Sequence, residues 1–435
     1  MSTPLHDPQV PACPAGDLGA EFDPFAVDSA AWYAFMRRAR GEQPVFHSPA
    51  LDYWVVTRWD DVMAVLHDSD TFSSANTLVP IKPPCPAAGA ALQAHGVNPG
   101  TSLVDLDPPE HGVQRRIFRR AFTPERVAAL QPRTVAFVEE ALDLIVARGE
   151  ADIVKDLMWE VPAKVAFLLM GVPDSEVDNV KAGTQRMATF GWGVPDDEQQ
   201  TDLATAIGEY WRFAESQVDR LIDDPGEDNL MSDVIREWRR PGNDDMFTRD
   251  GLCWMFLNVL FAGHETTTNA SAAGIRALLE HRDQWEALCA DPSLIPNAVE
   301  EILRYDTSVP TWRRVTTRAT TLGDVDLPEG ANLLVALGSA NRDDARFRDG
   351  DTFDIRRENA SDQIAFSWGR HTCLGARLAR MEMRVVLEHV TRRLPHMQLV
   401  LDQEWTYSPN TSHRGPEQVL VTWDPAQNPR PEDRP

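Results

Sequence analysis

The segment FSWGRHTCLG, residues 366–375, constrains this chain most, because it places one cysteine on a glycine-rich loop just ahead of a helical pattern. Gly369 and Gly375 let the backbone pass close to the sulfur of Cys373. A helix predicted from about Leu374 directs the positive end of its dipole at the same point, which favours a thiolate. The loop is suited to present a thiolate to a metal, although a buried structural cysteine is the simpler interpretation of this residue alone.

The other cysteines limit which metal centre the chain can build. The chain has five cysteines, scattered and without a CxxC pair, so a zinc ribbon, a cysteine-ligated iron–sulfur cluster and a disulfide framework are not expected. A zinc site at His371 and Cys373 lacks a second pair of ligands, and nothing else supports a Cys–His hydrolase. One sulfur without a second protein ligand suits a cofactor that brings four in-plane ligands of its own, namely haem.

Size and charge narrow the class of protein further. With 435 residues, 43% of them hydrophobic, the chain can bury a large core. A net charge of −25 disfavours nucleic acid and anionic membranes as partners. There is no apolar run of about 18 residues and no signal-peptide pattern at the N-terminus. We therefore expect a cytoplasmic protein with no nucleic-acid and no membrane partner.

Hydrophobic periodicity indicates a mainly α fold with small β-sheets. Helical spacing is clearest over residues 124–148, 206–224, 248–290 and 378–394. Extended patterns occur over residues 51–59, 313–337, 397–409 and 418–423. We expect a flexible segment over 1–20, one domain over 21–424 and a Pro-rich tail or linker stub over 425–435.

Three further motifs carry polar groups at helical positions. AGHETT, residues 262–267, lies between apolar flanks, and a threonine hydroxyl that bonds back to a carbonyl can open the helix locally. Its acid and alcohol could form a proton path, and an exposed polar face is the alternative. The pairs Glu301/Arg304 and His111/Arg115 have i, i+3 and i, i+4 spacing, which by itself is common on helix surfaces.

In this order and spacing, the motifs resemble those of bacterial cytochromes P450. FSWGRHTCLG is similar to the family's haem-binding loop, AGHETT to its oxygen-activating motif and EEILR to its ExxR pair. Stretches such as DPSLIPNAVEEILR resemble the haem domain of self-sufficient enzymes, which carry a fused FMN/[2Fe–2S] reductase of the phthalate-dioxygenase type. The resemblance covers about residues 22–427 and implies the cytochrome P450 fold, a single large triangular helical domain.

The resemblance implies haem b as the cofactor and Cys373 as the proximal iron ligand. Glu265 and Thr266 would deliver protons, and Glu301 with Arg304 would form a structural ion pair that Arg356 or Arg357 completes. The remaining cofactor-binding residues would be the propionate partners His111, Arg115, Arg314 and His371 and the loop residues Phe366 and Gly375. The substrate pocket would include Leu257, Phe261, Ala262, Val309, Thr311, Asn410 and Thr411.

The implied activity is that of a monooxygenase, which inserts one oxygen atom from O₂ into a small, mostly apolar or aromatic substrate by hydroxylation or O-dealkylation. Electrons would come from a ferredoxin-type donor or a fused FMN/[2Fe–2S] reductase. Basic residues near the cysteine are expected to form the electron-entry face: Arg116, Arg119, Arg120, Arg370, Arg377 and Arg380. The alternatives are a haem-based gas or redox sensor without turnover, which needs no proton relay, and a peroxygenase, which an arginine in place of Thr266 would favour.

Overall fold

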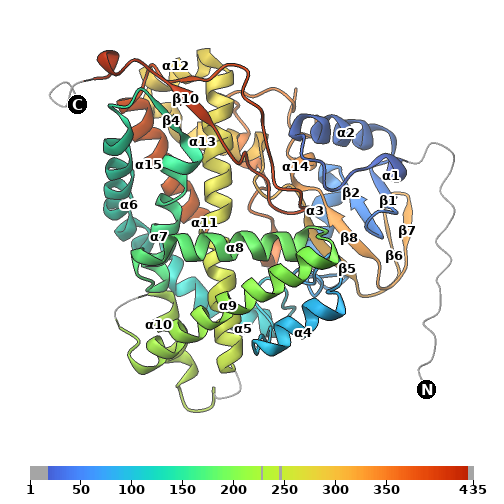
Figure 1. Ribbon diagram of the computed structural model, residues 1–435. Coiled ribbons are helices and arrows are strands. Elements are labelled where there is room, and N and C mark those ends of the chain that lie inside the picture. Colours follow the sequence, from blue (N-terminus) through green and yellow to red (C-terminus); the bar gives the residue numbers. More distant parts are fainter. Residues whose placement is uncertain (1–17, 227–228, 244–246, 430–435) are drawn as a thin grey trace, which may run out of the picture.

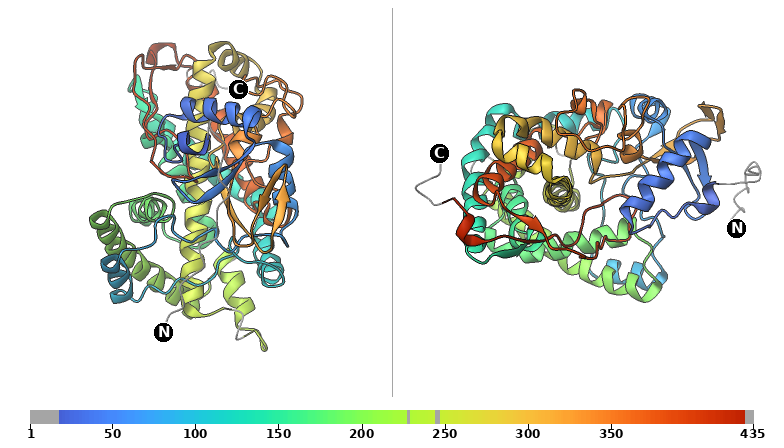
Figure 2. Two further views of the ribbon diagram at one scale, coloured as in Figure 1. Left: turned by 90° about the vertical axis from the view of Figure 1, so that its right-hand side faces the viewer. Right: turned by 90° about the horizontal axis from the view of Figure 1, so that it is seen from above.

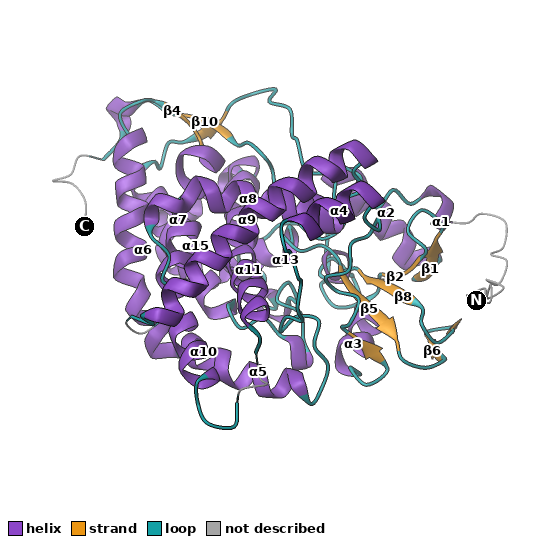
Figure 3. Cartoon of the chain, turned by 60° about the horizontal axis from the view of Figure 1, so that its bottom comes forward, coloured by secondary structure: helices purple, strands orange, loops and turns teal. Residues whose placement is uncertain are grey.

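Most helices lie on one side of the molecule and the largest sheet on the other, in a computed structural model that describes residues 18–226, 229–243 and 247–429 (Figures 1 and 3). The helices are α1 (Leu18–Glu21), α2 (Ser29–Glu42), α3 (Trp59–His67), α4 (Pro86–Ala94), α5 (Glu110–Phe118), α6 (Pro124–Ile145), α7 (Val161–Met170), α8 (Val177–Trp192), α9 (Asp197–Asp223), α10 (Leu230–Trp238), α11 (Arg249–Glu280), α12 (Arg282–Ala290), α13 (Ile295–Tyr305), α14 (Leu337–Ala340) and α15 (Ala376–Arg393). The strands are β1 (Val45–Ser48), β2 (Tyr53–Val56), β3 (Phe72–Ser73), β4 (Glu150–Asp152), β5 (Trp312–Thr316), β6 (Thr320–Leu322), β7 (Val325–Leu327), β8 (Asn332–Val335), β9 (Gln398–Leu399) and β10 (Leu420–Thr422). The predicted class, mainly α with small sheets, is confirmed.

Helix α11 forms the axis of the helical part. Seen from above it points at the viewer with other helices around it (Figure 2). The helix begins at Thr248, whose hydroxyl accepts the N–H of Gly251 over 2.9 Å, and it ends at His281. The predicted helical run over 248–290 is therefore two helices, α11 and α12. Buried residues occur on every side of α11, as expected for a helix at the centre of a large core.

Two glycines of α11 allow its neighbours to pack closely. A Cβ at Gly263 would lie 3.1 Å from the Cβ of Ala166 in α7, and one at Gly274 would lie 2.7 Å from the side chain of Ile302 in α13. Helices α6, α7, α9, α13 and α15 contribute to the same core. Helices α8 and α9 pass across α11 in Figure 1. This packing positions the central stretch of α11 opposite the segment that precedes α15.

The main sheet has the strand order β1-β2-β8-β5-β3, with β2 and β8 parallel and the other pairs antiparallel. A second sheet, β4-β10-β9, joins the C-terminal segment to the end of α6. The strand predicted over 397–409 is shorter in the structure, because only Gln398 and Leu399 pair. A turn with φ of +58° at Asp402 ends the pairing, and the chain then continues as an irregular loop.

Structured residues extend slightly beyond the predicted domain, 21–424, at both ends. Leu18 is buried and Leu18–Glu21 is helical, so the structured part begins before residue 21; residues 1–17 lie outside the described residues. At the other end, Asn428 donates to the Val146 carbonyl over 3.1 Å, so the ordered chain continues past residue 425. Among the described residues, no helix combines the length and apolar character needed to cross a bilayer.

Candidate active site

Cys373 lies on a tight loop that glycine makes possible. Its N–H donates to the Phe366 carbonyl over 2.9 Å and closes the loop. Gly369 has a φ of +73°, and a Cβ there would lie 2.6 Å from the Leu66 carbonyl oxygen, so a larger residue would clash. Helix α15 begins at Ala376, close to the predicted start. The loop therefore holds the sulfur just ahead of the N-terminus of α15.

The surroundings of the Cys373 sulfur both oppose and support a thiolate. Burial raises the pKa of the Cys373 thiol, while the N–H groups of Gly375 and Ala376 and the guanidinium of Arg115 act in the opposite direction. The part of Cys373 that stays accessible lies on the wall of a mostly apolar cavity. A sulfur with donated hydrogen bonds that faces an apolar space has the environment a metal-bound thiolate needs.

The cavity extends from the cysteine loop to the middle of α11. Phe366, Cys373 and Gly375 line it on one side, and Ala262 and Thr266 on the other. No group of three or more potential metal-ligating side chains occurs in the part of the chain that the structure describes. A cofactor that supplies its own in-plane ligands fits this arrangement.

Two histidines lie against each other beside the cavity. The rings of His111 and His371 are 4.2 Å apart between centroids, and His371 lines the cavity. Burial, with the charges of Arg314 and His111, lowers the pKa of His371 to about 3. The Nε2 atoms of both rings are buried without a hydrogen-bond partner among the described residues. Buried polar atoms of this kind call for a partner.

Two arginines supply the positive charge of this cluster, to which the neutral histidines add ring nitrogens. Arg314 is 2% exposed and donates to the Arg313 carbonyl over 2.7 Å. Burial lowers its pKa to about 10, against the opposing charge of Asp107. Arg115 lines the cavity and donates to the Thr372 carbonyl over 2.6 Å. Buried cations are stable when an anion completes the site, so the cluster fits the two carboxylates of haem.

Thr266 forms a hydrogen bond back to a carbonyl of its own helix, but the local opening of the helix that the sequence suggested does not occur. Its hydroxyl donates to the Ala262 carbonyl over 3.1 Å, one turn back, and the residue lines the cavity opposite Cys373. The helix itself stays continuous through this turn. The hydroxyl is thus held at the cavity wall without a break in α11.

Glu265 faces a second cavity, of about 480 Å³, and does not line the cavity that holds Cys373. Its carboxylate accepts from Thr184 over 3.0 Å and lies 3.1 Å from His264 Nε2 and 3.8 Å from Lys181 Nζ. Burial would raise the pKa of Glu265, but Lys181, His264 and Thr184 outweigh it and lower the pKa to about 2. The acid and alcohol that the sequence pairs are separated because consecutive helix residues project about 100° apart.

Three of the seven predicted pocket residues line the cavity with Cys373: Phe261, Ala262 and Val309. The side chain of Leu257 does not line this cavity, because it is fully buried in the main hydrophobic core.

The other three, Thr311, Asn410 and Thr411, support the C-terminal loop. The Thr311 hydroxyl donates to the Thr411 carbonyl, and the Thr411 N–H donates to the Trp192 carbonyl over 3.0 Å. Asn410 lines the second cavity. These residues therefore hold the C-terminal loop in place and do not line the cavity that holds Cys373.

The structure adds residues to the cavity that the sequence analysis missed. Trp192, Trp312 and His413 line it, and His413 and Phe261 line both cavities. His413 follows Thr411, a predicted pocket residue, by two positions, so the prediction for Asn410 and Thr411 was the available signal. Glu382 also lines the cavity; its Oε2 has no hydrogen-bond partner among the described residues, and burial raises its pKa well above the usual range. An acid on the apolar face of α15 could have been found from its helical spacing.

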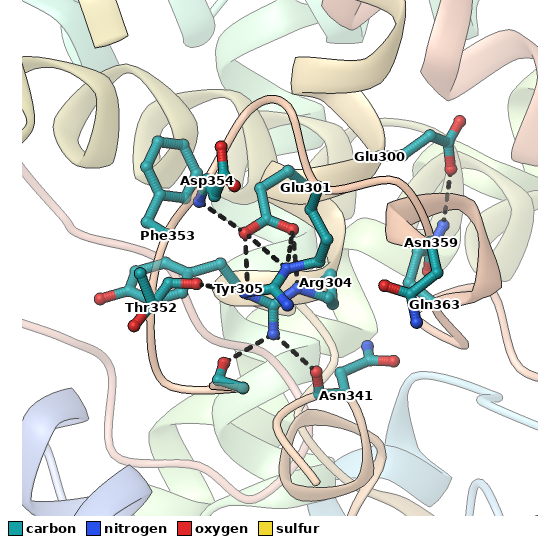
Figure 4. A network of polar contacts seen from close by, with 12 residues as sticks. Glu300, Glu301, Arg304, Tyr305, Asn341, Thr352, Phe353, Asp354, Asn359 and Gln363 are labelled. Carbon is teal, nitrogen blue, oxygen red and sulfur yellow. Dashed lines mark hydrogen bonds and ion pairs between the residues drawn. The ribbon is translucent and has the colours of Figure 1, made fainter. Parts of the chain in front are cut away.

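A buried ion network lies on α13 (Figure 4). Glu301 and Arg304 are fully buried and form a two-point pair, with N–O distances of 2.7 and 2.8 Å. Arg304 also donates to the carbonyls of Asn341, Gly350 and Thr352. Of the two predicted partners, Arg357 joins the pair, 3.2 Å from Glu301.

Comparisons with a family model and with known sequences indicate the same protein family. The family model described as Cytochrome P450 matches residues 202–410. Cytochrome P450 107B1 of Saccharopolyspora erythraea is 34% identical over 404 residues, which are 90% of this chain and 95% of that protein.

Solved structures agree in fold over nearly the whole chain. An intact type IV self-sufficient cytochrome P450 monooxygenase has a TM-score of 0.92 at 45% identity, covering 97% of this chain. The match covers only 55% of that longer protein. The P450 heme domain of Tepidiphilus thermophilus has a TM-score of 0.89 at 38% identity, with 96% of this chain and 99% of that one covered.

Proposed function

The chain belongs to the cytochrome P450 family, whose members bind haem, and on that premise we propose that it is a haem-thiolate monooxygenase. The observation that carries the proposal is the cavity with Cys373 on one wall and Thr266 on the other. Bound haem b would supply the iron that binds O₂ and, through its thiolate ligand, the electron density that favours O–O cleavage. The domain that carries this activity would include residues 21–424.

We assign the proximal ligand to Cys373. The N–H groups of Gly375 and Ala376 would donate to the sulfur and favour the thiolate, against the burial that raises the pKa of the thiol. The buried cluster described above would bind the two propionates: His111, Arg115, Arg314 and His371. Phe366 and Gly375 would contact the cofactor from the cysteine loop. Each of these groups is already placed by contacts within the protein, so binding would need little rearrangement.

We assign proton delivery to Thr266, supplied from Glu265. The Thr266 hydroxyl is fixed at the cavity wall by its bond to Ala262. Glu265 stays ionised at neutral pH and lies on the second cavity, which contains polar groups such as Gln185 and Asn269. A proton would therefore enter through the second cavity and pass Glu265 before it reaches Thr266.

The substrate would be a small, mostly apolar or aromatic molecule that undergoes hydroxylation or O-dealkylation. The cavity wall between the cysteine loop and α11 is dominated by apolar side chains, among them Leu103, Val104, Ala166, Leu169 and Val309. A cavity of this kind gains most of its binding energy from apolar area removed from water.

Electrons would come from a ferredoxin or from a fused FMN/[2Fe–2S] reductase. The likeness to an intact self-sufficient enzyme favours the fused form. Arg116 and Arg119 are exposed near the cysteine loop and fit a docking surface for an acidic donor. Arg380 fits it less well, because it is bound to Glu300 at 2.6 Å. The cytoplasmic location expected from the sequence stays a prediction.

Cys373→Ala tests the assignment directly. The variant should lose the red-shifted Soret band of the ferrous–CO thiolate form, while Cys289→Ala on α12 should keep it. The haem-loaded wild type, given an iron–sulfur donor and ¹⁸O₂, should place one labelled atom in a hydroxylated product of an alkoxyaromatic test compound or in the aldehyde that O-dealkylation releases. Retention of the thiolate band in Cys373→Ala would overturn the ligand assignment.

A further inference from the structure

Four aromatic rings form a cluster on the wall of the Cys373 cavity: Trp192, Phe261, Trp312 and His413. The His413 ring meets Trp192 and Phe261 edge-on, with centroid distances of 4.8 and 4.7 Å. Trp192 lies 5.3 Å from Phe261 and stacks on Trp312 at 6.3 Å. Rings at these distances form a continuous apolar surface that suits a flat ligand.

Two members of this aromatic cluster carry polar atoms without partners. Both ring nitrogens of His413 and the Nε1 of Trp192 are covered from solvent and make no hydrogen bond among the described residues. His413 is 7% exposed and Trp192 is 5% exposed. Burial lowers the pKa of His413 to about 4, so the ring is neutral at pH 7 and offers one donor and one acceptor.

The backbone around these two residues is held in place. The Asn410 side-chain oxygen accepts the N–H groups of Ser412 and His413, at 3.0 and 2.6 Å. The Thr411 N–H donates to the Trp192 carbonyl over 3.0 Å and ties the loop to the end of α8. Polar groups on a fixed backbone cost little entropy when a ligand binds them.

We propose that His413 and Trp192 together recognise a hydroxyl group on the substrate. The Trp192 Nε1–H donates to the hydroxyl oxygen, and the hydroxyl in turn donates to the unprotonated nitrogen of His413. The substrate class is then a flat apolar or aromatic molecule with one hydroxyl group, such as a substituted phenol. The inference rests on the proposed function and narrows its substrate.

The test compares two compounds that differ only in this group, 4-methoxyphenol and 4-methoxytoluene. An apolar cavity without a polar partner should bind the toluene derivative roughly 5- to 100-fold more tightly, because a buried hydroxyl without a partner is costly. Isothermal titration calorimetry on the haem-loaded wild type should instead give the phenol an equal or lower Kd. A wild-type Kd for the phenol that is tenfold higher would overturn the inference.

Variants assign the effect to the two residues. In His413→Phe and in Trp192→Phe, which keep an aromatic ring, the Kd of the phenol should rise about 5- to 30-fold, and that of the toluene derivative should change less than about twofold. His396→Phe, at an exposed position, should leave both values unchanged. A phenol preference that persists in both cluster variants would also overturn the inference. These two outcomes concern only the recognition of the hydroxyl group. The proposed function is tested separately and is contradicted if Cys373→Ala keeps the thiolate band.

Discussion

At the scale of single residues, the arrangement of Glu265 and Thr266 is the most informative. The two are neighbours in sequence, yet Thr266 lines the cavity with Cys373 and Glu265 lines the second cavity. The carboxylate is held by Lys181, His264 and Thr184, which keep it ionised. A role of Glu265 in proton supply would therefore need a path from the second cavity to Thr266, which the sequence did not reveal.

Thr266→Ala should keep haem and substrate binding and lower the product formed per electron pair, because the hydroxyl at the cavity wall is lost. Glu265→Gln should lower the rate of product formation without changing the ferrous–CO spectrum. Each effect should lie within the 10²–10⁴ range typical of proton-transfer groups. Thr205→Ala, on the exposed side of α9, is the control. Coupling and rate equal to wild type in both variants would exclude this pair from proton delivery.

At the scale of elements, α15 carries a buried acid on the helix that follows Cys373. Glu382 is 1% exposed, and burial raises its pKa well above the usual 4.5. The unfolded chain releases this proton near pH 4.5 while the folded chain keeps it. The folded state thus binds more protons above pH 4.5, and the contribution of Glu382 to stability falls as pH rises towards the folded pKa.

Glu382→Gln removes this dependence. The free energy of unfolding of the variant relative to wild type should rise by about 1.4 kcal/mol per pH unit above pH 5.5, until the folded pKa is reached. Urea unfolding of both haem-loaded proteins at pH 5.5, 6.5 and 7.5 measures it. A difference that stays constant over this range would show that Glu382 ionises normally.

The buried ion pair of α13 should contribute to the stability of the folded protein. Glu301→Gln keeps the shape of the side chain but leaves Arg304 and Arg357 without their carboxylate, so we expect a loss of about 3–5 kcal/mol in unfolding free energy. Glu160→Gln is the matched control, because its i, i+4 pair with Lys164 is at the surface and contributes at most about 0.5 kcal/mol. Equal losses measured by urea unfolding would contradict a structural role for the buried pair.

At the scale of the whole molecule, charge decides how an electron donor approaches. The net charge of −25 repels an acidic donor at long range, whereas a basic patch acts within the Debye length of about 8 Å at physiological salt. The exposed Arg116 and Arg119 lie on α5 and the turn after it, whereas Arg120 is bound to Glu237 at 2.8 Å. The effective basic patch is thus smaller than the sequence predicts.

Arg119→Glu should slow reduction by an acidic iron–sulfur donor at low salt, since it weakens the local attraction, and peroxide-driven turnover should not change. Stopped-flow reduction at two ionic strengths measures this. The control for total charge is Arg148→Glu. Arg148 lies close to β4 in sequence, and β4 and α5 lie at opposite ends of the view in Figure 1. If both variants are reduced at the same rate, net charge and not the patch determines docking.

The sequence by itself determined the family, the mainly α fold and the cysteine loop, because these features depend on local motifs and local spacing. Gly369 is required by a positive φ, and helical periodicity identifies α6, α9 and α15. The contacts of Arg304 with Glu301 follow from i, i+3 spacing on one helix. Each of these features depends on residues close in sequence, and such interactions can be read without the fold.

Only the tertiary structure decided which side chains share a cavity. His413 meets Trp192 and Trp312 because the C-terminal loop packs between the end of α8 and β5, segments about 100 to 220 residues apart. The packing of α11 against its neighbours likewise places Glu265 at the second cavity and Leu257 in the core. Contacts between distant segments depend on how whole helices and loops pack, and one chain's residue pattern does not encode that packing in any local window.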